Sequence, residues 1–255
     1  MSGEGVRPAG ELSGRVVLVT GAHGGLGAAA AHACARAGAT VVLLGRKLPR
    51  LNRLYDSVAA AGPEPLLYPM DLEGATPDDH ATLAARIGDE LGRLEGVLHC
   101  AADFHGLTPL LHTDPAAFAR ALHVNLTARA WLSQACLPLL TAAEDSGLVF
   151  VVDDLSRVGK AFWGGYGLAQ HAQHGLVGML HAETARSGVR VSGLQPGPMR
   201  TGLRSRAYVE QGDTRAVDPA RAAEACVTLL SPSGAAYRGQ VWAPFAGVQA
   251  EAVAP

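Results

Sequence analysis

Short apolar runs rich in β-branched residues alternate along this chain with longer stretches rich in alanine and leucine. Such an order predicts parallel strands joined by helical crossovers. Most of the apolar runs lack polar alternation, as expected of strands that are buried on both faces. We therefore predict a doubly wound α/β fold of the Rossmann type, with helices on both faces of a parallel sheet of about seven strands. The expected strands are residues 15–20, 39–44, 65–69, 96–100, 147–152, 189–194 and 239–243.

The chain has 255 residues, a length that one α/β domain can reach, and no change of composition marks a domain boundary. We expect a single dinucleotide-binding domain over residues 14–246. The segments 1–13 and 247–255 are expected to be flexible tails.

Two helices have start signals with a physical basis. Thr76-Pro77 and Asp218-Pro219 each place a capping oxygen before a proline, which we expect at the first helical position. The stretch 196–217, rich in Pro and Gly, is long and irregular enough to be a loop that folds over a site.

The charge balance and the cysteines limit the possible partners. Lys and Arg number 21 against 23 Asp and Glu, so no excess of cations is available to neutralise a nucleic acid. The four cysteines are far apart and form no Cys-x-x-Cys pair, which argues against a zinc site and a disulfide framework. No stretch resembles a signal peptide or a membrane span. We expect a cytoplasmic protein with no metal site and no nucleic-acid or membrane partner.

A glycine-rich turn stands between the first expected strand and an alanine-rich stretch. Its sequence over residues 20–27 is TGAHGGLG, followed at once by AAAAHACARAG. Glycines let the backbone approach a ligand closely, and the free N–H groups at a helix start attract a pyrophosphate. Alternatively, the glycines serve only close packing of strand against helix. We predict a dinucleotide site that includes Gly21, His23, Gly24, Gly25, Leu26 and Gly27.

With these features the chain resembles the short-chain dehydrogenase/reductase family over nearly its whole length. The resemblance rests on the GxxxGxG spacing, on Asp71 after the third strand, and on the motifs HVNLTARAWLSQACLPLL, WGGYGLAQ and QPGPMRT. It implies that the glycines line the pyrophosphate, that Asp71 holds the adenine edge, and that Thr201 lies near the carboxamide end of the cofactor. The other cofactor-binding residues that we expect are Leu72, Ala101, Tyr166, Gln170, Pro196 and Gly197.

The residues after the second strand bear on which nicotinamide cofactor is bound. Proteins that prefer NAD(H) usually place a carboxylate there for the ribose hydroxyls, whereas this chain has Gly45-Arg46-Lys47. Because an arginine can clamp a 2′-phosphate, we expect NADP(H) to be favoured over NAD(H). The alternative is that Arg46 and Lys47 form an ordinary solvated pair.

The family resemblance also implies a catalytic set of serine, tyrosine, lysine and asparagine, which this sequence matches only in part. Tyr166 and Asn125 match, but Gln170 takes the place of the lysine and Asp153 that of the serine. We take these four residues as the candidate catalytic residues.

The two replacements change the expected proton chemistry. A tyrosine that acts as an acid or base near neutral pH needs its pKa of about 10 lowered by a nearby cation, and Gln170 supplies no charge. It could still hydrogen-bond the ribose. An ionised Asp153 would raise the pKa of Tyr166, whereas a protonated Asp153 could donate a hydrogen bond as serine does.

Other side chains are candidates for an acid or a base. His174 lies on the helix face of Gln170 and is the first of them. Ser156 would need a shifted loop to replace the serine. The remaining candidates are His105, His112, His123 and His171.

Two functions of different classes follow. The first is an NADP(H)-dependent oxidoreductase that interconverts a carbonyl and an alcohol on a small organic substrate, with Tyr166 as the proton donor. The second is a catalytically silent or specialised relative that acts as a nucleotide-binding sensor or as the non-catalytic subunit of an oligomer. Residues 115–140 and 163–186 resemble helices that the family uses in dimer interfaces. We therefore expect a homo-oligomer, dimer or tetramer, or else a hetero-oligomer with an active relative.

The substrate itself does not follow from the sequence. Loops 102–113, 154–165 and 196–217 are expected to shape its pocket. An apolar lining is suggested by Phe104, Leu107, Phe162 and Trp163.

Overall fold

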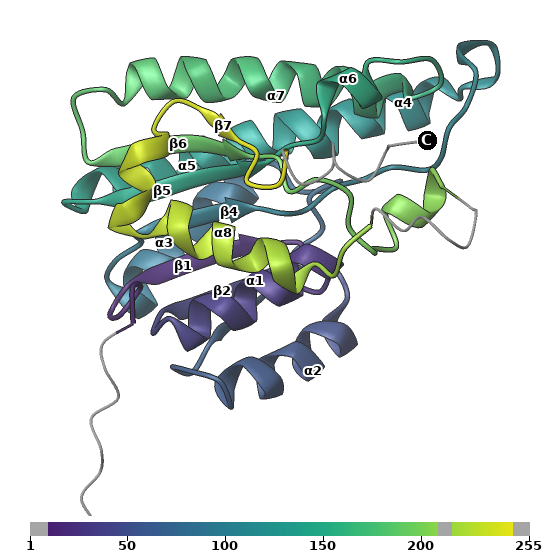
Figure 1. Cartoon of the computed structure of the whole chain (residues 1–255). Coiled ribbons are helices and arrows are strands. Elements are labelled where there is room, and N and C mark those ends of the chain that lie inside the picture. Colours follow the sequence, from purple (N-terminus) through teal and green to yellow (C-terminus); the bar gives the residue numbers. More distant parts are fainter. Residues whose placement is uncertain (1–9, 209–215, 247–255) are drawn as a thin grey trace, which may run out of the picture.

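The structure is a computed structural model that describes residues 10–208 and 216–246; the tail segments 1–9 and 247–255 lie outside the described residues. Its centre is a parallel sheet with the strand order β3-β2-β1-β4-β5-β6-β7 (Figure 1). Each strand lies within two residues of the expected range. The strands are β1 (Val16–Thr20), β2 (Thr40–Gly45), β3 (Leu66–Pro69), β4 (Gly96–His99), β5 (Ser146–Val151), β6 (Val189–Leu194) and β7 (Val241–Trp242).

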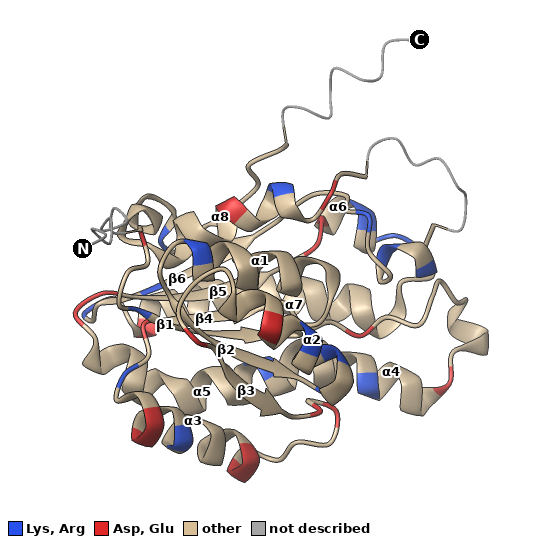
Figure 2. Ribbon diagram, turned by 90° about the horizontal axis from the view of Figure 1, so that it is seen from below, with Lys and Arg blue, Asp and Glu red and all other residues tan. Residues whose placement is uncertain are grey.

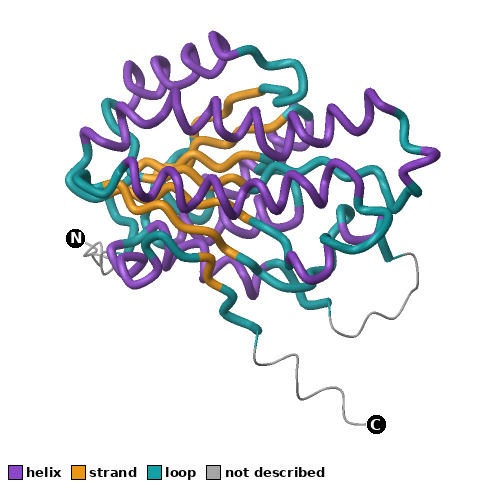
Figure 3. Tube along the Cα trace, turned by 90° about the horizontal axis from the view of Figure 1, so that it is seen from above, coloured by secondary structure: helices purple, strands orange, loops and turns teal. Residues whose placement is uncertain are grey.

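Helices cover both faces of the sheet, which confirms the predicted doubly wound architecture (Figure 3). One face is covered by α1 (Gly25–Arg36), α2 (Leu48–Ala59) and α8 (Ala220–Leu230). The other is covered by α3 (Pro77–Leu91), α5 (Ala128–Ala142) and α7 (Gly164–Glu183), and α4 (Pro115–Leu122) packs against α7. A five-residue π-helical turn, His123–Thr127, joins α4 to α5. The shorter helices are α6 (Leu155–Val158), η1 (Leu110–His112), η3 (Arg204–Arg206) and η4 (Pro232–Tyr237).

Most strand side chains are apolar because successive side chains enter two different cores. In β1, Val17 and Val19 pack beneath α1 and α8, whereas Val16 and Leu18 pack beneath α3 and α5. All four are at most 5% exposed. Full burial of such a side chain contributes about 1.5–3 kcal/mol, so both faces of the sheet stabilise the fold.

The helix starts and the N-terminal boundary can be compared with the expectations. Thr76 caps α3 and Pro77 is its first residue, as predicted, and Asp79 completes a capping box with Thr76. The α8 prediction was wrong by one residue: Pro219 precedes the helix, and Asp218 Oδ1 accepts a hydrogen bond from the N–H of Ala220 at 2.8 Å. Residues 10–13, expected in the tail, pack on the domain, because Leu12 is fully buried and donates to Ala37 O.

The topology fixes where a ligand can lie. From β1 the chain adds β2 and then β3 toward one edge of the sheet. It then crosses back through α3 to place β4 on the other side of β1, so the strand order reverses between β1 and β4. In open α/β sheets, ligands bind beyond the carboxyl ends of the strands at such a point. Among the helices of the described ranges, none has the length and apolar character that a membrane crossing requires.

Candidate functional site

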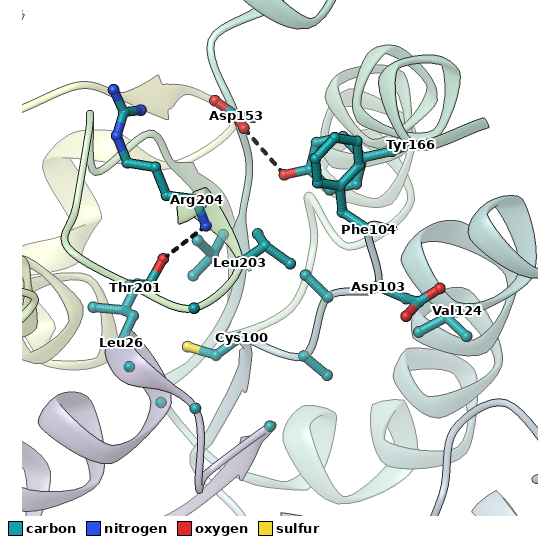
Figure 4. Close-up of a pocket in the computed structure, with 18 of the residues that line it drawn as sticks. Leu26, Cys100, Asp103, Phe104, Val124, Asp153, Tyr166, Thr201, Leu203 and Arg204 are labelled. Carbon is teal, nitrogen blue, oxygen red and sulfur yellow. Dashed lines mark hydrogen bonds between the residues drawn. The ribbon is translucent and has the colours of Figure 1, made fainter. Parts of the chain in front are cut away.

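A pocket of about 420 Å³ opens at the carboxyl edge of the sheet, a size typical of small-molecule sites (Figure 4). The segments that follow β1, β2, β4, β5 and β6 line it together with α7. The structure brings together here nearly all the residues predicted from the sequence. These are Gly21, His23, Gly24, Gly25, Leu26, Gly27, Arg46, Asp71, Leu72, Ala101, Asp153, Tyr166, Gln170, Pro196, Gly197 and Thr201.

The glycine turn after β1 has no room for larger side chains. Gly21 has a φ of +62°, and a Cβ there would lie 2.7 Å from the Cα of Ala101. A Cβ on Gly27 would lie 2.3 Å from the carbonyl oxygen of Gly21. The helix α1 begins at Gly25 with no side-chain cap, so its first N–H groups are available to an anion. This cradle fits a pyrophosphate.

Basic side chains gather at the end of the pocket beside α2. Arg46, Lys47 and Arg50 line this end, and Arg46 lies 3.8 Å from the carboxylate of Asp71. Burial, together with these three cations, lowers the pKa of His23. Figure 2 shows basic positions near α2 and also near α6. Within the described residues the lining holds seven Lys and Arg against four Asp and Glu, although the whole chain carries a net charge of −2. The pocket therefore favours anionic ligands.

Tyr166, Asp153 and Gln170 form a hydrogen-bonded group at the other end of the pocket. The hydroxyl of Tyr166 donates to Oδ2 of Asp153 at 3.0 Å (Figure 4). The N–H of Asp153 donates to Oε1 of Gln170, also at 3.0 Å. The side-chain nitrogen of Gln170 has no acceptor among the residues that the structure describes, so it is available to a ligand in the pocket.

The environment of Tyr166 opposes its ionisation. Its ring packs against Phe104 and Trp163, with centroids 5.1 and 5.9 Å away. Burial and then the Asp153 carboxylate raise the pKa of Tyr166 well above its ordinary value, against the opposing effect of Arg129 and Arg157. At neutral pH the phenol is therefore a hydrogen-bond donor.

Asn125 is not among the residues that line the pocket. Its side chain is fully buried within the π-helical turn and bonds to main-chain groups. Nδ2 donates to Asp103 O at 2.7 Å and to Ala121 O at 2.8 Å, while Oδ1 accepts from Asp103 N at 3.0 Å. In this structure Asn125 holds the segment after β4 in place, and its side-chain amide is fully used in doing so.

The other candidate acids and bases lie outside the lining that the described residues form. Ser156 is bound to Asp154 at the start of α6, with Oγ donating at 2.7 Å. Burial lowers the pKa of His174, but the residue does not reach the pocket. The same holds for His105, His112, His123 and His171.

The expected apolar lining is present only in part. Phe104 and Trp163 line the pocket and stack on each other at 5.0 Å. Leu107 and Phe162 lie outside it and are 41% and 53% exposed, because the loops that carry them turn outward. Loop 196–217 does contribute to the lining with residues 196–208, as far as the described part extends.

Several residues in the lining were not anticipated from the sequence. Arg129 reaches the pocket from α5, Arg157 from α6, and Arg206 and Tyr208 from the segment after β6. The ring of Tyr208 lies 4.3 Å from the guanidinium of Arg204. Isolated arginines in helices and loops carry no spacing signal, so these residues could be found only from the fold.

Comparisons with known proteins agree with this geometry. The family model for short chain dehydrogenases matches residues 15–212. The uncharacterized oxidoreductase YciK of Escherichia coli K12 is 35% identical over 210 residues, or 82% of this chain and 83% of that protein. A protein from Pseudomonas syringae, described as a short chain dehydrogenase, has a solved structure with a TM-score of 0.87 at 39% identity, over 95% of this chain and 99% of that one.

A second solved structure contains a cofactor. This protein from Escherichia coli CFT073, also described as a short chain dehydrogenase, is complexed with NADPH. It matches with a TM-score of 0.87 at 32% identity, over 93% of this chain and 99% of that one. With the parallel sheet, the glycine turn and the tyrosine at the pocket in place, the chain belongs to the short-chain dehydrogenase/reductase family of oxidoreductases.

Proposed function

We propose that this protein is an NADP(H)-dependent oxidoreductase that interconverts a carbonyl and an alcohol on a small organic substrate. The observation that carries the proposal is a single pocket with a glycine cradle and basic side chains at one end and Tyr166 at the other. The first end suits the phosphates of a dinucleotide. The second places a proton donor where a substrate oxygen can be reached.

The preference for NADP(H) rests on the residues after β2. Arg46, Lys47 and Arg50 present three cations at the adenosine end, and a guanidinium binds a phosphate through paired hydrogen bonds. Asp71 and Leu72 would hold the adenine, and the free amide nitrogen of Gln170 would donate to a ribose hydroxyl. When bound, the nicotinamide would supply or accept the hydride.

The chain's own contribution to the reaction is proton transfer at Tyr166. In the reducing direction the phenol donates its proton to the oxygen of the former carbonyl. Asp153, which accepts the Tyr166 hydrogen bond at 3.0 Å, orients the hydroxyl but also opposes its ionisation. Phe104 and Trp163 form an apolar wall that excludes water from this end.

The raised pKa of Tyr166 favours a second candidate function. If the phenol does not release its proton, the protein would bind nucleotide without turnover, as a sensor or as the non-catalytic subunit of an oligomer. Its cofactor site would then be the functional feature.

One experiment separates the two candidates. Purified protein is mixed with NADPH and a panel of small aldehydes and ketones, and the loss of NADPH absorbance is followed, with Tyr166→Phe as the matched control. Oxidation that requires Tyr166 supports the oxidoreductase. Saturable NADPH binding without oxidation of the cofactor by any member of the panel supports the silent relative.

We also propose a cytoplasmic homo-oligomer. On α7, the large apolar side chains of Leu168 and Met179 are 56% and 62% exposed, and a second copy of the chain packed along this helix would cover them. All four cysteines lie in the described part of the chain and are free thiols there, as suits a reducing compartment. Light scattering on the eluted protein should give at least twice the chain mass; a monomer at high concentration would contradict the oligomer.

A further inference from the structure

Arg129 is a buried cation with no role in the reaction proposed above. Its side chain comes from the first turn of α5, is 1% exposed, and has no carboxylate partner in the described parts of the chain. The guanidinium donates to the carbonyl of Val151 at 2.9 Å, to the carbonyl of Ala101 and to Oε1 of Gln173. Neutral acceptors offset only part of its lost hydration. Burial lowers the pKa of Arg129 to about 10, which leaves it charged near neutral pH.

The three acceptors belong to the segments that carry the site. Ala101 follows β4, Val151 ends β5 two residues before Asp153, and Gln173 lies about two turns beyond Tyr166 on α7. Arg129 itself is part of the pocket lining. Its charge therefore lies where β4, β5 and α7 meet.

Charged groups face Tyr166 from three elements. Asp153, after β5, raises the pKa of the phenol, while Arg129 from α5 and Arg157 from α6 lower it. Arg157 is only half-buried, so water weakens its effect, whereas a charge in the interior is screened far less. Arg129 also faces the end of β4, where it adds to the effect of burial that lowers the pKa of His99 and opposes the effect of burial that raises the pKa of Cys100.

We propose that Arg129 is a positioning residue for proton transfer, which supplies from α5 the positive charge that the family's lysine would supply from position 170. The proposal rests on the proposed oxidoreductase function. In the reducing direction the carbonyl carbon takes the hydride that a bound nicotinamide would supply, the O–H bond of Tyr166 breaks, and its proton forms the new O–H bond of the alcohol. The electron pair stays on the phenolate oxygen, and the Arg129 guanidinium stabilises that negative charge.

The test measures the ionisation of Tyr166 directly. Tyrosine absorbance is titrated with pH in an Asp153→Asn background, which keeps the burial of Tyr166 but removes the carboxylate that raises its pKa further. The same protein with Tyr166→Phe is subtracted, so that only Tyr166 contributes to the difference. This readout needs neither cofactor nor turnover, so a protein without reductase activity still gives a result.

Three variants at position 129 or 170 are then compared in that background. Arg129→Gln keeps polar contacts but loses the charge, and the midpoint of Tyr166 should rise by about 1–3 pH units. Arg129→Lys should leave the midpoint close to that of its parent. Adding Gln170→Lys to Arg129→Gln should bring the midpoint back down, because the charge returns from α7.

If Arg129 had only a structural role, its charge would not matter to Tyr166, and the midpoint of the Tyr166 titration would not follow the charge at position 129. Arg190→Gln is the matched control, because Arg190 is also buried but pairs with Asp145 at the other end of the sheet, and this variant should not move the midpoint. A folded Arg129→Gln protein with an unchanged midpoint would overturn the proposal, as would a lysine variant that shifts as far as the glutamine variant. If Arg129→Gln does not fold, Arg129→Met takes its place and the same outcomes apply.

Discussion

The hydroxyl of Tyr166 donates a hydrogen bond of 3.0 Å to Oδ2 of Asp153, in a pocket that the phenol shares with a glycine cradle. This bond holds the phenol in one orientation and keeps its proton in place. A carboxylate so close to a tyrosine stabilises the neutral form, which is why burial and Asp153 together raise the pKa of Tyr166. The rate of any proton transfer from Tyr166 therefore depends on Asp153.

Replacement of Asp153 should make Tyr166 a better acid. In Asp153→Ser the carboxylate is gone, the pKa of Tyr166 falls, and kcat for a carbonyl substrate at pH 7 should rise, by at most about tenfold for each unit by which the pKa falls. The measurement is the pH profile of kcat. Asp154→Asn is the control, because Asp154 caps α6 through Ser156 N at 2.9 Å and does not line the pocket. A fall in kcat for Asp153→Ser would mean that the carboxyl group itself transfers the proton.

Replacement of Arg46 should change the choice of cofactor. Arg46→Ala removes a charged contact to a 2′-phosphate, so the Kd for NADPH should rise by about 10–100-fold while that for NADH stays the same. Fluorescence titration with both cofactors measures the ratio. Arg53→Ala is the control, since Arg53 is exposed on α2, shortly after Arg46 in the chain, and lies outside the pocket. Equal weakening of both cofactors would refute the assigned role of Arg46.

The strand positions and the glycine-rich and basic end of the pocket could be predicted from the sequence because they follow local rules. An apolar run of strand length, or a glycine turn between a strand and a helix, can be recognised from a short stretch of sequence without knowledge of the rest of the chain. Gly21, Gly25 and Arg46 are all of this kind, and the structure places them around one pocket. The register of the sheet then brings the strand ends together without further information.

The residues that could not be predicted depend on packing between distant segments. Arg129 stands in the stretch ARAW and reads as an ordinary helix residue, yet α5 packs so that its guanidinium meets the ends of β4 and β5. Asn125 carries the family's motif, but in the π-helical turn its amide is used on Asp103 and Ala121. Leu107 and Phe162 are apolar yet exposed. They were expected in the pocket because they are apolar, but composition does not tell which way a loop turns.

The glycine cradle should be intolerant of a single methyl group. In Gly21→Ala the positive φ of +62° and the 2.7 Å approach to Ala101 both act against the new Cβ. The free energy of unfolding should fall by about 1–3 kcal/mol, and NADPH binding should be lost. Urea denaturation and cofactor titration measure the two effects. Gly74→Ala, where nothing lies within 4 Å, should leave both unchanged, and equal behaviour of the two variants would argue against a tight cradle.

Stability should fall as the pH drops below about 6.5. Burial lowers the pKa of His99 well below its ordinary value of 6.5, so the unfolded chain binds a proton there that the folded chain does not. Stability then rises with pH through this range, with a slope of up to about 1.4 kcal/mol per pH unit for each such histidine. The contribution of neutral His99 is present above pH 6.5 and is lost progressively below it.

His99→Asn should make that pH dependence shallower. The substitution also removes the bond of His99 to Ser133 Oγ at 2.9 Å, so the slope between pH 7 and pH 5, and not the absolute stability, is the relevant quantity. Urea denaturation at several pH values gives the slope. His112→Asn is the control, because His112 is exposed on η1. If both variants keep the slope of the wild type, His99 does not cause the acid sensitivity.

The central claim is that the pocket at the carboxyl edge of the sheet binds a pyridine dinucleotide through its glycine cradle and its basic end. Isothermal calorimetry with NADPH and NADH on the unmodified protein measures this most directly. We predict saturable binding of one NADPH per chain, with NADH bound more weakly. Failure of both cofactors to bind at millimolar concentration would contradict the account and would leave only the fold.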